Sequence, residues 1–273
     1  MRIVPVAVML VLAVAAVGAA QPPDGERLYR QNCARCHEGD LPVLFSSGPI
    51  REYPAGRIYE ALSAGLMAGQ ATGLSTEDKR AVAEYVSGSA PGTLAAPIDQ
   101  IPPTTYCSSG APAADPYVGP SWNGWSPDRG NARFQSADAA GLGANSVPDL
   151  ALKWAFGFPG VTVASLQATI VGGRALVGSG VGVVYALDAD TGCLQWAHET
   201  DAGVRSTIIV GPGPGGRATA FFGDLTGNAY AVDFETGERR WKVEVDDHRH
   251  ARITGAPALY DGRLYVPVAS LEE

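Results

Sequence analysis

Hydrophobic residues follow a helical spacing in the first third of the chain and alternate with polar residues later. Residues 57–69 (RIYEALSAGLMAG) form a short amphipathic segment, and residues 76–88 carry Val82, Tyr85 and Val86 on one face. Asp24 and Ser75 are suited to begin helices as N-caps. From about residue 170 onward, apolar stretches alternate and are broken by glycine-rich turns, as in short β-strands. The pattern predicts a helical part followed by an all-β part.

The β part repeats with a period of about 45 residues. The segment ALDADTGCLQW (186–196) returns as AVDFETGERRW (231–241), and each is preceded by a Gly-Arg turn; a third copy opens as DGRLYVPVASLEE. This period with a recurring Trp predicts four-stranded propeller blades. Gly192 and Gly237 should occupy positive-φ turn positions, and each Trp should dock between blades. Because propellers close with about 4–8 blades, we expect a propeller truncated after about two to three blades, in the N-terminal part of a longer polypeptide.

Composition and the first residues limit the class of protein. The chain is 46% hydrophobic and has a net charge of −8, which favours a globular protein and disfavours a nucleic-acid partner. Residues 1–20 resemble a signal peptide, with Arg2, an apolar run at 3–17 and small residues before Gln21. The apolar run is short for a membrane span, so we expect cleavage after Ala20, no stable span afterwards, and a periplasmic or secreted protein.

The motif CARCH places Cys33, Cys36 and His37 at the spacing of c-type haem attachment. Two thiols would bond the haem vinyl groups, and the adjacent His would ligate iron. A redox dithiol or half of a zinc site is disfavoured, because no second Cys/His pair with metal-ligand spacing follows. After signal cleavage Met67 is the only methionine left, so a thioether sixth ligand would be Met67. The alternative is that Met67 only fills the core and that the iron is five-coordinate or has a histidine as its sixth ligand.

Other polar groups indicate less specific chemistry. Cys107 and Cys193 can form an interdomain disulfide, or either can pair with a cysteine elsewhere, so their connectivity stays open. His248 and His250 lack a clear third ligand and favour a solvated loop over a metal site. The glycine-rich stretch GPGPGG lacks the Lys-Ser/Thr ending of a phosphate loop and is predicted to be an inter-strand turn.

Residues 22–88 resemble class I cytochromes c, whose first and last helices cross beside the haem. We therefore divide the chain into the signal peptide (1–20), an all-α cytochrome c domain (21–88), a proline-rich linker (89–120) and an all-β quinoprotein-type propeller (121–273). The segment 122–156 and the two D-x-x-T-G-x-x-x-W repeats resemble pyrroloquinoline quinone-dependent dehydrogenases. A cytochrome placed before the propeller, with DDHRHARITGAP after the second Trp, is similar to the polyvinyl-alcohol dehydrogenase (cytochrome) group.

This resemblance implies oxidation of a secondary, and in this group polymeric, alcohol to a ketone. Pyrroloquinoline quinone would accept hydride beside calcium, and haem c would pass electrons to an acceptor such as a cytochrome or oxidase. In related enzymes the calcium ligands and catalytic carboxylate come largely from later blades, so no catalytic residue is assigned in this chain. Two alternatives remain. In the first, a cytochrome electron carrier is fused to a propeller that binds other molecules without catalysis. In the second, the 273-residue chain is itself the mature cytochrome, and a partner protein covers the open strand edges of its partial set of blades.

Two loops occupy the same place in successive repeats, just before the first strand of a blade. They contain Arg205 with Thr207, and Arg252 with Thr254, which we expect to face the axial mouth of the propeller. Arginine matches carboxylates such as those of the quinone in a bidentate way. The alternative is that these arginines are structural partners of acidic residues such as Asp246 or Asp247.

Overall fold

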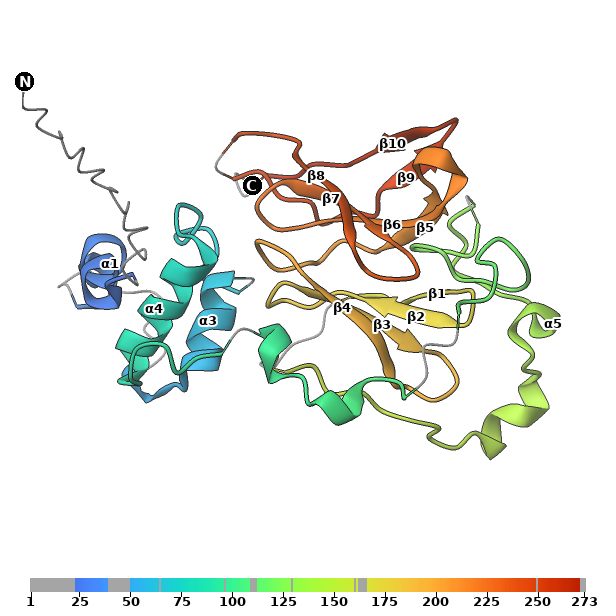
Figure 1. Ribbon diagram of the computed structural model, residues 1–273, viewed down its shortest axis with the longest axis horizontal. Helices are drawn as coiled ribbons and strands as arrows, with labels where there is room; N and C mark the ends of the chain where they lie inside the picture. Colours follow the sequence, from blue (N-terminus) through green and yellow to red (C-terminus); the bar gives the residue numbers. More distant parts are fainter. Residues whose placement is uncertain are drawn as a thin grey trace, which may run out of the picture.

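The structure is a computed structural model that describes residues 23–38, 50–63, 65–95, 97–108, 112–128, 130–159, 161, 166–248 and 250–270. Helices gather at one end of the molecule and β-sheets at the other, and the connecting segment runs along the sheets (Figure 1). The expected signal peptide lies outside the described residues. Among the residues that are described, no helix is both long and apolar enough to cross a membrane.

The helical part consists of short helices that begin where the capping residues predict. Asp24 accepts a hydrogen bond from the Arg27 backbone, and Ser75 forms a reciprocal capping box with Asp78. The helices are α1 (Gly25–Asn32), α2 (Ala34–His37), η1 (Ile50–Glu52), α3 (Ala55–Ser63) and α4 (Thr76–Ser87). Predicted helix starts and apolar faces are thus confirmed here.

Helices α1 and α4 cross in close contact. A Cβ atom at Gly25 would lie 2.1 Å from the Ala81 backbone oxygen, so only glycine permits this approach. The Tyr29 and Tyr85 rings meet beside the crossing with centroids 5.5 Å apart. Tyr29 and Val82 are buried in the core that the two helices share.

The proline-rich segment after α4 packs against both parts of the protein. The buried Glu84 carboxylate accepts hydrogen bonds from the backbone N–H groups of Gly92 (2.9 Å) and Leu94 (2.6 Å). The segment then forms η2 (Pro97–Gln100) and η3 (Pro103–Thr105), and Ile101 joins a core of the first sheet. Cys107 forms a disulfide with Cys193. This disulfide ties the connecting segment to the first sheet, so the segment lies along the sheet as well as linking two domains.

Two antiparallel sheets of four strands each follow the two complete repeats. A short helix α5 (Ala137–Ala140) and η4 (Ala144–Asp149) precede them. The first sheet is ordered β1 (Thr169–Val171), β2 (Arg174–Val177), β3 (Val183–Asp188), β4 (Leu194–Glu199). The second is ordered β5 (Ile209–Pro212), β6 (Ala218–Gly223), β7 (Asn228–Asp233), β8 (Arg239–Glu244), with the single-turn η5 (Pro214–Gly216) between β5 and β6. Strands β9 (Ala258–Tyr260) and β10 (Arg263–Tyr265) pair as a hairpin. The predicted four-stranded units are confirmed.

The tryptophan motifs dock one repeat on the next. Trp196 donates from Nε1 to the Phe234 carbonyl at 3.0 Å, and its ring covers Gly237, where an added Cβ would lie 2.6 Å from the ring. Gly192 and Gly237 both have positive φ, as the turn pattern predicts. Trp154 makes the same pair of contacts with Ala189 and Gly192. It is therefore a second docking tryptophan beside Trp196, and the repeat comparison missed it.

Candidate functional site

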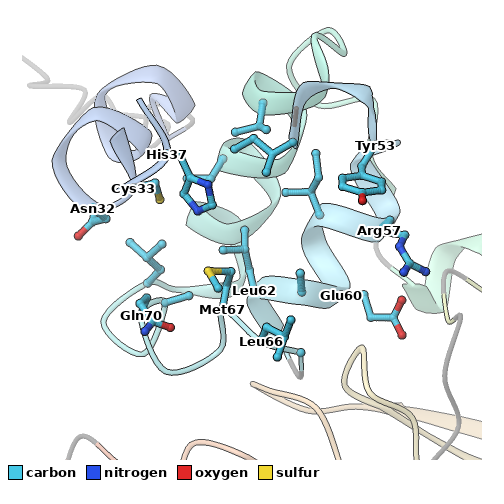
Figure 2. A pocket seen from close by; sticks show the side chains of 18 of the residues that line it. Asn32, Cys33, His37, Tyr53, Arg57, Glu60, Leu62, Leu66, Met67 and Gln70 are labelled. Atoms are coloured by element: carbon cyan, nitrogen blue, oxygen red, sulfur yellow. The ribbon is translucent and has the colours of Figure 1, made fainter. Parts of the chain in front are cut away.

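A cavity of about 800 Å³ lies between the helical part and the sheets. Cys33, Cys36, His37 and Met67 all line it, and Figure 2 shows the His37 ring and the Met67 sulfur extending into the same space from opposite walls, with Cys33 close to His37. Most of the remaining lining is apolar and comes from the helical part, including Ile50, Ile58, Leu62, Val82 and Val86 of the helices and Leu74 of the loop before α4. The structure thus brings all four predicted haem residues to one cavity.

The local backbone explains how the motif presents its side chains. The Cys36 and His37 N–H groups both donate to the Cys33 carbonyl at 3.1 Å, which winds the motif into one helical turn. Residues three and four apart on such a turn share a face, so Cys33, Cys36 and His37 point the same way. Both cysteines are free thiols. Burial, followed by the neighbouring Cys36, raises the pKa of the Cys33 thiol.

Met67 lies in the loop that follows α3, residues 65–74. Its N–H donates to the Ala61 carbonyl at 3.0 Å, and its own carbonyl accepts from Ala71 at 3.0 Å. The loop faces the Cys-x-x-Cys-His turn across the cavity. Two free thiols, an imidazole and a thioether around a largely apolar space fit a covalently attached c-type haem.

The sheet part supplies one wall of this cavity. Leu166, Gly180 and Arg205 line it, and Arg205 is exposed there. Sequence reasoning did not find this wall, because neither spacing nor periodicity tells how two domains meet.

Helix α4 and the first sheet make further contacts beside the cavity. Arg80 forms an ion pair with Glu199 at 2.9 Å, and the Thr76 hydroxyl donates to the Asp201 carbonyl at 3.1 Å. Tyr59, Ala83 and Val181 are buried together in an apolar cluster. The cytochrome-like part is therefore seated directly on the strands.

The four residues expected to face a quinone lie in different surroundings. Arg205 lines the haem-type cavity. The Thr207 hydroxyl is buried and has no hydrogen-bond partner among the described residues, and Thr254 is half-buried. Arg252 is only 4% exposed and donates to the Ala251 carbonyl and to the Thr72 hydroxyl of the helical part. The two arginine loops thus both reach the helical part, and Arg252 is paired there with Thr72 rather than with Asp246 or Asp247.

A buried charge cluster surrounds Arg252. Asp224 is fully buried and accepts from Thr226, Asn228 and the Tyr230 hydroxyl. Lys79 of α4 is 3% exposed, and its burial, followed by the charge of Arg252, lowers its pKa, while Asp224 opposes the shift. Sequence reasoning missed Lys79 and Asp224, whose place in an interface has no local signature.

No group of three or more His, Cys, Asp or Glu side chains that could hold a metal ion occurs among the residues that the structure describes. His248 and His250 lie side by side with ring centroids 5.6 Å apart, and neither belongs to such a group.

The family comparisons divide the chain as the fold does. Residues 20–86 match a family described as cytochrome C oxidase, cbb3-type, subunit III, and residues 151–272 match one described as outer membrane protein assembly factor BamB. The chain therefore combines a cytochrome c domain with a propeller-type domain of the quinoprotein and BamB kind. The individual relatives indicate a more specific class of protein. The chain is related to proteins named polyvinylalcohol dehydrogenase, which confirms the resemblance found in the sequence.

Two such relatives cover nearly all of this chain. The protein from Pseudomonas sp is 37% identical over 98% of this chain, and that from Sphingopyxis sp. (strain 113P3) is 36% identical over 90%. The chain spans only 43% and 39% of their lengths. Among solved structures, the quinohemoprotein alcohol dehydrogenase from Comamonas testosteroni is similar with a TM-score of 0.48 and 22% identity, over 55% of this chain and 23% of that chain.

Proposed function

We propose that this chain is the electron-transfer end of an exported quinohaemoprotein that oxidises an alcohol. The observation that carries the proposal is the single cavity in which Cys33, Cys36, His37 and Met67 meet against a wall made by the sheets. The relatives named polyvinylalcohol dehydrogenase support an alcohol as the substrate, and a secondary, polymeric alcohol is the specific proposal. Domains at 21–88 and 121–273, a signal peptide at 1–20 and a periplasmic or secreted location are parts of the same proposal.

Each residue of the cavity has a distinct task in holding haem c. Cys33 and Cys36 would bond the vinyl groups, while His37 and Met67 would ligate the iron. When bound, the haem supplies a one-electron centre, and a His/Met ligand pair favours electron transfer over oxygen chemistry. The largely apolar lining would limit the access of water to the iron ligands. Leu166, Gly180 and Arg205 close the cavity on the side where the propeller lies.

For pyrroloquinoline quinone, we propose that the loops containing Arg205, Thr207, Arg252 and Thr254 supply part of the surroundings. The buried Thr207 hydroxyl, which has no hydrogen-bond partner within the described part of the chain, and the exposed Arg205 support this placement. Two guanidinium nitrogens of Arg252 already have protein partners, so Arg205 is the better candidate for a quinone carboxylate. The base that removes the hydroxyl proton and the ligands of calcium are proposed to come from residues outside this chain.

A second candidate is a cytochrome fused to a propeller that only binds another protein. The match of residues 151–272 to the family described as outer membrane protein assembly factor BamB favours it. In that case electrons would enter the haem from a partner protein, and alcohol would not reduce it.

The test is to express the polypeptide encoded by the whole gene in a host that attaches c-type haem. Haem that stays bound after denaturation, and is lost in a Cys33→Ala/Cys36→Ala variant, would establish the attachment site. Alcohol should then reduce the haem only when quinone and calcium are added. A covalently attached haem that no alcohol reduces under these conditions would contradict the dehydrogenase and leave the binding propeller.

A further inference from the structure

The loop that presents Met67 is held by a few hydrogen bonds. Thr72 is central to it, because its hydroxyl donates to the Gly69 carbonyl at 2.8 Å and approaches the Ala68 carbonyl at 3.2 Å. Together with the Ala71 N–H to Met67 carbonyl bond, these contacts close residues 67–72 into a compact turn. The loop is not part of an α-helix or strand, so its opening depends on these local bonds.

The sheet part supplies an additional partner for this turn. Arg252 Nη2 donates to the Thr72 hydroxyl oxygen at 3.1 Å, across 180 positions of sequence. This bond leaves the hydroxyl hydrogen of Thr72 free to donate to Gly69, so the two interactions are compatible. Arg252 thus connects the loop between β8 and β9 to the turn that begins at Met67.

Arg252 is itself held rigidly. Its backbone N–H and carbonyl both pair with Ala269 at 2.8 Å, and the N–H of the next residue, Ile253, donates to the Asp224 carbonyl at 3.0 Å. Its side chain is 96% buried and also donates to the Ala251 carbonyl at 2.9 Å. A buried, charged donor on a fixed backbone makes a stronger and better directed hydrogen bond than a mobile surface arginine.

We propose that Arg252 is a positioning residue for the axial ligand Met67: the propeller, through Arg252 and Thr72, holds the 65–74 loop so that the thioether stays on the haem iron. The strength of the sulfur–iron bond is then set partly by the docking of the two domains. This inference rests on the proposed haem ligation, and it assigns Arg252 a role on the haem side of the interface.

The test measures how easily an added ligand displaces Met67 from ferric haem in the full chain. Imidazole binds only when the thioether has left the iron, so its apparent affinity rises in proportion to the fraction of open loop. Arg252→Met replaces the arginine by an unbranched apolar side chain and removes the guanidinium that donates to Thr72. Since hydrogen bonds to charged groups are among the stronger ones, we expect imidazole to bind about tenfold more tightly or better. The thioether-to-iron charge-transfer absorption should weaken in parallel.

Three further variants make the result specific. Thr72→Val removes the acceptor without removing a buried charge. It also removes the bonds to Gly69 and Ala68, so its effect should be at least as large as that of Arg252→Met. In the Thr72→Val background, Arg252→Met should add little. Arg252→Lys retains a cationic donor and should restore part of the affinity difference. Arg80→Gln breaks another interdomain contact, the ion pair with Glu199, away from the loop, and should leave imidazole affinity unchanged. An Arg80→Gln effect as large as that of Arg252→Met would overturn the proposal, as would an unchanged imidazole affinity in Arg252→Met.

The failure of the underlying ligation would be recognised separately. Met67→Ala should itself increase imidazole affinity and abolish any further effect of Arg252→Met. If Met67→Ala changes nothing, the proposed iron ligand is wrong. Amide hydrogen exchange of residues 65–74 would then test, independently of the iron ligand, whether Arg252 holds this loop. The proposal requires faster exchange of these amides in Arg252→Met than in Arg80→Gln. Equal exchange rates in the two variants would overturn it.

Discussion

Replacing Gly25 by alanine should destabilise the helical part specifically. The added Cβ would lie 2.1 Å from the Ala81 carbonyl oxygen and 2.6 Å from its carbon, and both are backbone atoms that cannot rotate away. Ordinary contact needs about 3.4 Å or more, so α1 and α4 must separate by about 1 Å. This shift would loosen the packing of Tyr29 on Tyr85. Overpacking of this kind costs about 1–3 kcal/mol.

The two parts of the chain can be followed separately in one melt. Every tryptophan of the chain lies at or after Trp122, so tryptophan fluorescence reports the sheets, whereas haem absorbance reports the helical part. For a domain of this size, 1–3 kcal/mol corresponds to a decrease of about 5–20 °C in the haem-detected midpoint. The fluorescence midpoint should change much less.

Gly56→Ala is the matched control. Gly56 also lies in a helix of the same part, but an added Cβ there meets nothing within 4 Å. Alanine favours the helical conformation more than glycine does, so this variant should stabilise the helical part by up to about 1 kcal/mol and raise its haem-detected midpoint. A Gly25→Ala protein that melts like the unmodified one, or the same decrease in both variants, would refute the crossing argument.

Three other changes probe the sheets. Replacing both Cys107 and Cys193 by serine should cost about 2–4 kcal/mol in denaturant unfolding followed by tryptophan fluorescence, because the disulfide closes a loop of 86 residues; an unchanged midpoint would contradict this. Trp196→Ala should lower the free energy of unfolding by about 3–5 kcal/mol. Gly237→Ala places a methyl group against the same ring, so in the Trp196→Ala background it should destabilise the protein less than it does alone. Burial lowers the pKa of His198, so the unfolded chain takes up a proton on this ring at a higher pH than the folded protein does. The free energy of unfolding should therefore fall as the pH drops below about 6.5, by up to about 1.4 kcal/mol per pH unit. His198→Gln should remove that part of the slope.

The sequence predicted the parts of this protein whose signals are local. Capping residues and apolar spacing located α1 and α4, and the repeated Asp-x-x-Thr-Gly motif located the turns of both sheets. The haem motif is likewise a matter of adjacent residues, since one helical turn is enough to bring Cys33, Cys36 and His37 to one face. Met67 could be singled out because no other methionine remains after the expected cleavage.

What the sequence did not predict depends on how distant segments meet. The bond between the Arg252 guanidinium and Thr72 is one example, because it forms where the helical part covers the loop that carries Arg252. Lys79 reads as an exposed helical lysine but is buried by the same docking. Trp154 escaped notice for a different reason: the turn before it lacks the Asp-x-x-Thr-Gly pattern, so only its spacing of about one repeat before Trp196 could have revealed it.

The docking tryptophans also make each repeat depend on the one that follows it. Trp154 donates to a turn of the first sheet, and Trp196 donates to the corresponding turn of the second sheet. Each ring therefore finds its hydrogen-bond acceptor only when the following repeat is folded. Unfolding of one sheet would expose the tryptophan of the segment before it, so damage to one repeat is passed to its neighbour on the N-terminal side.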